Sequence, residues 1–99
     1  MSGEAPGRDL GFDDFEAKVG ELFYLGSESG SVPLALEEAR PLGDSLRPGG
    51  AFSLVFLGPA DPLLPQAIYR LNFDGEPHDV FLVPIARDAS GTRYEAIFN

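Results

Sequence analysis

Length and composition limit this chain to one small domain. Its 99 residues are 43% hydrophobic and include eight Phe and three Tyr, enough for a globular core. Sixteen acidic residues against seven basic ones give a formal net charge of -9. Nucleic-acid binding needs clustered Lys and Arg, and an anionic membrane surface would repel this chain, so neither is expected as a partner.

The sequence also indicates where the domain begins and in which compartment it lies. Residues 1–9 are rich in Gly, Pro, Ser and charge, which predicts a flexible tail and leaves residues 10–99 as a single domain. The absence of cysteine excludes disulfides and thiolate chemistry. We see neither a signal-peptide pattern nor an apolar run near the roughly 18 residues of a membrane span. We therefore expect a cytoplasmic protein, or one incorporated into an assembled particle.

A short helix is predicted at the start of the domain. Phe12, Phe15 and Val19 recur near a helical period, and Gly20 can end the helix as its C-cap. We expect the three apolar side chains to cover one end of the core.

From Glu21 onward, apolar residues alternate with period two between regular turn signals, the pattern of an all-β domain. The predicted strands cover residues 21–26, 32–40, 51–58, 67–73, 78–87 and 92–99. Asp74-Gly75 is the strongest hairpin signal. We expect a small six-stranded antiparallel barrel or sandwich, with the short N-terminal helix capping one end.

We expect an irregularity in the fifth predicted strand and an open edge at the sixth. In the fifth, Phe81, Val83 and Ile85 share a face, and Pro84 predicts a bulge or an unpaired position. The sixth strand ends the chain and is a candidate for an open edge of the sheet.

The sequence contains few patterns that indicate a catalytic or a metal-binding site. His78 beside Asp79 is the one histidine-based candidate, and no nucleophile elbow accompanies it. One His without Cys cannot build a zinc site, and the acidic clusters lack the spacing of a calcium loop. We therefore predict a non-enzymatic protein with no catalytic residue, metal or cofactor. An enzyme built on His78 and Asp79 is the least favoured alternative.

Binding to a protein partner, or to further copies of the chain, is the predicted function. A proline-stiffened loop before the fourth strand carries two leucines, which either fold onto the barrel mouth as a lid or face a partner. The last strand could pair with a partner strand, or its charges could merely protect an edge. The predicted contact residues are Asp61, Pro62, Leu63, Leu64, Pro65 and Gln66 in the loop, with Arg93, Glu95 and Ile97 in the last strand.

A different kind of binding is the main alternative. A small-ligand or carbohydrate-binding barrel would need a pocket lined by Tyr24, Tyr69 or Tyr94.

The blocks FLGPADPLLPQAIYRL (56–71) and FLVPIARDASGTRYEAIFN (81–99) resemble an uncharacterised bacterial family of short all-β domains of unknown function. The resemblance covers nearly all of the chain after Phe12 and implies no catalytic residues. It implies genes encoded near phage-tail-collar-like fibre proteins, and therefore an accessory or assembly role in a phage-tail-like or fibre system.

Overall fold

A computed structural model describes residues 11–27, 30–43, 51–61 and 63–98. Helix α1 (Phe12–Glu16) precedes the strands β1 (Leu22–Ser27), β2 (Gly30–Gly43), β3 (Ala51–Gly58), β4 (Ala67–Phe73), β5 (Glu76–Asp88) and β6 (Gly91–Phe98). The expected all-β class with one short helix is confirmed. The predicted tail, residues 1–9, lies outside the described residues.

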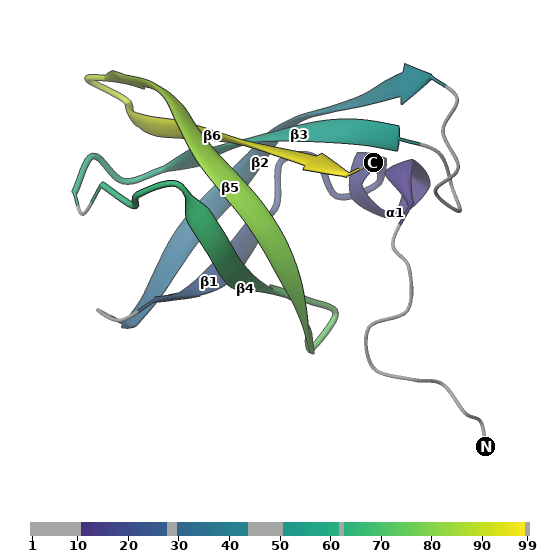
Figure 1. Ribbon diagram of the computed structural model, residues 1–99, viewed down its shortest axis with the longest axis horizontal. Coiled ribbons are helices and arrows are strands. Elements are labelled where there is room, and N and C mark those ends of the chain that lie inside the picture. Colours follow the sequence, from purple (N-terminus) through teal and green to yellow (C-terminus); the bar gives the residue numbers. More distant parts are fainter. Residues whose placement is uncertain (1–10, 28–29, 44–50, 62, 99) are drawn as a thin grey trace.

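The strands form a closed antiparallel barrel in the order β1-β2-β3-β6-β5-β4 (Figure 1). The ring closes between β1 and β4, where Leu25 lies opposite Leu71 and Gly26 opposite Arg70. β6 therefore pairs on both sides, with β3 and with β5. The expectation that β6 is an open edge is wrong, because two strands from earlier in the chain flank it.

The barrel interior is a continuous apolar core. It consists of Phe15, Phe23, Leu25, Val32, Leu34, Leu36, Phe52, Leu54, Phe56, Leu64, Leu71, Phe73, Val80, Leu82, Tyr94 and Ala96. Each strand contributes alternate residues, because successive side chains point to opposite faces. β3 is buried on much of both faces, because its side chains are largely apolar on both.

Helix α1 closes one end of this core with Phe15. The Phe15 ring is fully buried, and its centre lies 5.0–6.1 Å from the rings of Phe23, Phe52, Phe73 and Phe98. Figure 1 shows α1 beside the ends of β3 and β6 that carry Phe52 and Phe98. The helical end cap predicted from the sequence is therefore present.

The helix is shorter than expected, which changes the role of Val19. It ends at Glu16, with Ala17 as C-cap, and residues 17–20 form a turn. Val19 is consequently exposed and does not join the core, contrary to the prediction. Gly20, at φ +98°, reverses the chain, and its N–H donates to the Leu36 carbonyl of β2 at 2.8 Å.

Strand β5 lines the core with one of its two faces. Val80 and Leu82 occupy the core, whereas the face shared by Phe81, Val83 and Ile85 points outward. The strand is apolar on both faces, so alternation alone could not identify the inner one. The predicted irregularity near Pro84 is confirmed by a register shift between Pro84 and Ala86.

Strand β2 extends to Gly43, beyond the predicted end at residue 40. Arg40, Pro41 and Gly43 lie opposite Ser53, Phe52 and Ala51 of β3. Pairing with β3 therefore continues β2 through Pro41 and Gly43, although Pro and Gly are more typical of loops.

Lys18 links the turn after α1 to the β4–β5 hairpin. Its Nζ lies 3.0 Å from Asp74 Oδ1 and 5.4 Å from the centre of the Phe73 ring. The hydrogen bond to Asp74, together with the charge of that carboxylate, raises the pKa of Lys18 above its ordinary value of 10.5. A group whose pKa is raised by folding stabilises the fold below its unfolded pKa, and that contribution is lost as pH rises through the folded pKa.

A Lys18→Met variant should therefore be slightly less stable than wild type at neutral pH. Met keeps an apolar stem over the Phe73 ring but removes the charge. The difference should shrink as pH rises beyond 10.5, because wild-type Lys18 then loses its proton. Urea unfolding midpoints of both proteins across this pH range measure the effect. A constant difference at every pH would show that Lys18 acts through packing alone.

Candidate functional site

The proline-rich loop between β3 and β4 is folded down on the barrel mouth. Leu64 is buried, and its backbone N–H donates to the Tyr94 hydroxyl at 3.0 Å. The Tyr69 hydroxyl donates to the Pro65 carbonyl at 2.6 Å. The loop therefore acts as a lid opposite α1, which is one of the two roles expected from its sequence.

Part of the predicted loop contact surface remains accessible. Leu63 is exposed, as are Asp61 and Gln66, while Pro62 lies outside the described residues. Arg87 Nη2 donates to the Ala60 carbonyl at 3.1 Å and to Asp61 Oδ1 at 3.2 Å. The loop thus offers one solvent-facing leucine instead of the expected pair.

The Tyr94 hydroxyl should matter more to the lid than the Tyr69 hydroxyl. A Tyr94→Phe variant leaves the buried Leu64 N–H without its acceptor and should lower the free energy of unfolding by about 1–3 kcal/mol. Tyr69→Phe removes an exposed hydrogen bond and should change stability by less than about 0.5 kcal/mol. Chemical unfolding of both variants, with hydrogen exchange at Leu64, provides the measurement. Equal losses would mean that the lid is held by apolar packing alone.

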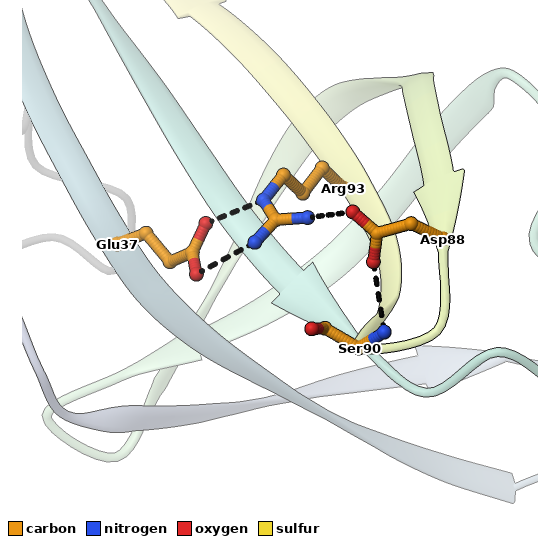
Figure 2. Close-up of polar contacts among 4 residues, drawn as sticks. All are labelled: Glu37, Asp88, Ser90 and Arg93. Atoms are coloured by element: carbon orange, nitrogen blue, oxygen red, sulfur yellow. Dashed lines mark hydrogen bonds and ion pairs between the residues drawn. The ribbon is translucent and has the colours of Figure 1, made fainter.

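Arg93, a predicted contact residue, braces the same end of the barrel (Figure 2). Its Nε and Nη2 lie 2.9 and 3.5 Å from the two Glu37 carboxylate oxygens, and its Nη1 lies 2.8 Å from Asp88 Oδ2. Asp88 Oδ1 accepts the Ser90 N–H at 2.8 Å. The hydrogen bond to Glu37 and the charge of Glu37 raise the pKa of Arg93.

This network spans three elements of the barrel. Glu37 lies where β2 shifts register against β3, and Asp88 lies at the end of β5. Arg93 therefore joins β2 to the β5–β6 hairpin across the outside of β3. Its guanidinium already binds carboxylates of its own chain, which favours a bracing role over direct partner contact.

The outer face of β4, β5 and β6 carries a row of exposed apolar side chains. Ile68, Phe81 and Ile97 expose 67%, 48% and 49% of their surface. Ile68 lies directly opposite Phe81. The β5–β6 pairing ends at Leu82 and Ala96, and Phe81 and Ile97 are the residues immediately beyond that last pair. These residues, called the apolar row below, run across neighbouring strands.

Glu95 lies next to the apolar row, between two valines. It is opposite Val55 of β3 on one side and Val83 of β5 on the other, and it is half-buried. Among the described residues, no hydrogen bond or ion pair reaches its carboxylate. Each Lys and Arg that the structure describes has a carboxylate partner elsewhere; these are Lys18, Arg40, Arg70, Arg87 and Arg93.

His78 and Asp79, the residues of the least favoured enzymatic alternative, point in opposite directions. The His78 side chain is 9% exposed, packs edge-on against Phe73 and lies 3.9 Å from Glu76. Asp79 lies on the outer surface and pairs with Arg70 at 3.3 Å. The pair therefore forms no hydrogen-bonded dyad, and no group of three metal-ligating side chains occurs in the described part of the chain.

The three tyrosines do not face a common pocket. Tyr94 is buried under the lid, the Tyr69 hydroxyl bonds Pro65, and Tyr24 projects outward from β1. The barrel interior where a ligand would sit is filled by the apolar core. This arrangement gives the small-ligand alternative no support.

Sequence reasoning identified Glu95 and Ile97 but missed Ile68 and Phe81 as contact candidates. The outward position of Ile68 follows from alternation in β4, where Leu71 and Phe73 are buried. Phe81 could not be assigned from alternation, because both faces of β5 are apolar. Only the pairing of strands shows that these residues adjoin.

Among known proteins, this chain is similar to one family of domains. Residues 10–98 match the sequence profile of a family described as a domain of unknown function (DUF6916). No curated protein and no solved structure gives a significant match. Over the described residues, no helix is long and apolar enough to cross a membrane.

Proposed function

This chain belongs to the DUF6916 family of domains of unknown function, and we propose that it is a non-enzymatic protein–protein interaction module. Its partner would bind the outer face of β4, β5 and β6, with the apolar row at the centre of the contact. An accessory role in a fibre or phage-tail-like assembly would be one use of such a module.

The observation that carries this proposal is the position of the apolar row. Ile68 and Phe81 are paired across β4 and β5, and Phe81 and Ile97 each lie immediately beyond the last residue pair of β5 with β6, whereas single exposed apolar residues are common on any protein. Contiguous exposed apolar side chains are typical of interaction surfaces. Covering them removes apolar area from water, which favours association.

The closed barrel also indicates how the partner would bind. From Thr92 to Ala96, β6 uses its backbone groups toward both β3 and β5, so this stretch cannot accept an additional strand. The contact at β6 would therefore be made by side chains. In the proline loop, the exposed Leu63 would be a secondary contact at most, since Leu64 belongs to the core.

Site-specific photocrosslinking tests the proposed function. A photoreactive phenylalanine analogue replaces Ile97 in one variant and Tyr24 in a control, in the cells that produce the protein. The two positions are matched in exposure, at 49% and 48%, and β1 lies opposite β6 in the ring order. We expect a discrete protein adduct from position 97 only. No adduct there, or the same adducts from both positions, would contradict an interaction surface on β4–β6.

A further inference from the structure

We propose that the partner is a cationic, partly apolar polypeptide segment, which places a Lys or Arg against Glu95 while its apolar residues cover the apolar row. This inference rests on the proposed function and specifies the chemistry of the partner. It follows from the position of Glu95, from the pairing of the chain's own cations and from the overall charge.

The first step concerns the surroundings of Glu95. Its carboxylate emerges between Val55 and Val83, and its neighbours on the outer face of β6 are Ile97 and Arg93, the latter paired with Glu37. A partner that covers the apolar row must also remove water from this half-buried acid. Burying an unpaired carboxylate is strongly unfavourable, so a partner that fits must supply hydrogen-bond donors there, preferably charged ones.

Lys and Arg side chains meet both requirements of this surface. Their methylene stems can lie along the valines and the apolar row, while the charged head reaches the carboxylate. Arg can also form two parallel hydrogen bonds to one carboxylate. A neutral apolar segment would leave Glu95 unpaired and therefore bind less well.

The chain itself does not supply this cation in its described part. Arg93, the nearest described cation along β6, is held by Glu37 and Asp88, and Arg70 across the apolar row pairs with Asp79. A second copy would bring the same occupied cations in its described part and a net charge of -9. Like charge opposes self-association, whereas it attracts a basic partner.

A random peptide library tests the inference with the whole chain as bait. Wild-type protein, Glu95→Gln and Glu16→Gln are each used to select binders at low salt. Both substitutions remove one negative charge, but Glu16 is exposed on α1, a different element from the strands that carry the apolar row. We expect wild type and Glu16→Gln to enrich peptides with Lys or Arg next to apolar residues. Glu95→Gln should lose the preference for cations.

Affinities of the selected peptides make the test quantitative. Glu95→Gln should weaken binding by about tenfold, because a charged hydrogen bond in a desolvated contact is lost. Glu16→Gln should weaken binding by less than about twofold, since only long-range attraction changes. Ile97→Ser combined with Phe81→Ser should abolish binding, with circular dichroism confirming that the fold is kept.

Three results would overturn the inference. They are selected peptides without cations, equal weakening by both Gln variants, or an oligomer of the wild-type chain that salt strengthens. The first two, obtained with a specific adduct at position 97, would leave the proposed function standing with a partner of different chemistry. A library without any binder, together with no adduct at position 97, would remove both proposals.

Discussion

Replacing Phe15 with alanine should lower the free energy of unfolding by about 3–5 kcal/mol, one of the largest effects of any single truncation in this chain. The Phe15 ring is fully buried and contacts four other phenylalanines at the end of the barrel. Deleting it loses the transfer free energy of the ring and leaves a cavity that the rigid strand ends cannot fill. Urea unfolding followed by the near-ultraviolet circular dichroism of Tyr and Phe measures the loss.

Two further variants serve as controls for the Phe15→Ala change. Val19→Ala, in the turn after α1, should change stability by less than about 0.5 kcal/mol, because Val19 is exposed. Phe15→Leu keeps most of the apolar volume and should cost clearly less than the alanine change. If Val19→Ala proved as damaging as Phe15→Ala, the longer helix predicted from the sequence would describe the protein better than the five-residue helix does.

The all-β class and most strand positions could be predicted because each strand carries its own signal. In β4 and β6 the alternation of buried and exposed residues matches the sequence pattern, since one face is distinctly more apolar. In β5 both faces are apolar, so the sequence did not indicate which of them is the inner one. The closure of the ring could not be predicted, because it depends on pairing between β1 and β4, which are distant in sequence.

The candidate site also depends on pairing between strands, which the sequence does not reveal. Glu95 and Ile97 could be predicted to face outward because they alternate with core residues on one strand. Their neighbours Val83 and Phe81 come from β5, and Val55 comes from β3, so only the register brings them together. Arg93 was predicted as a contact residue, but nothing in the sequence indicated that Glu37, in a distant strand, would bind its guanidinium.

Replacing Gly91 with alanine should destabilise the fold by roughly 3–5 kcal/mol, combining backbone strain with overpacking. Gly91 begins β6 at φ +135°, a conformation that L-residues rarely adopt. A Cβ there would collide with the Gly58 carbonyl oxygen and lie 3.3 Å from Leu57. The neighbouring strand end must move to admit it, which disturbs the register that holds Arg93 and the outer face of β6.

Gly75→Ala is the matched control for this change. Gly75 also has a positive φ, +82°, in the β4–β5 hairpin, but no described atom lies within 4 Å of the position that an alanine methyl group would take there. It should therefore cost only about 1–2 kcal/mol, the penalty of a left-handed conformation. Unfolding midpoints of the two variants separate strain from steric contact. Equal losses of stability in the two variants would show that Gly91 is required only for its positive φ. The close approach of β6 to Gly58 would then place no constraint on the outer face.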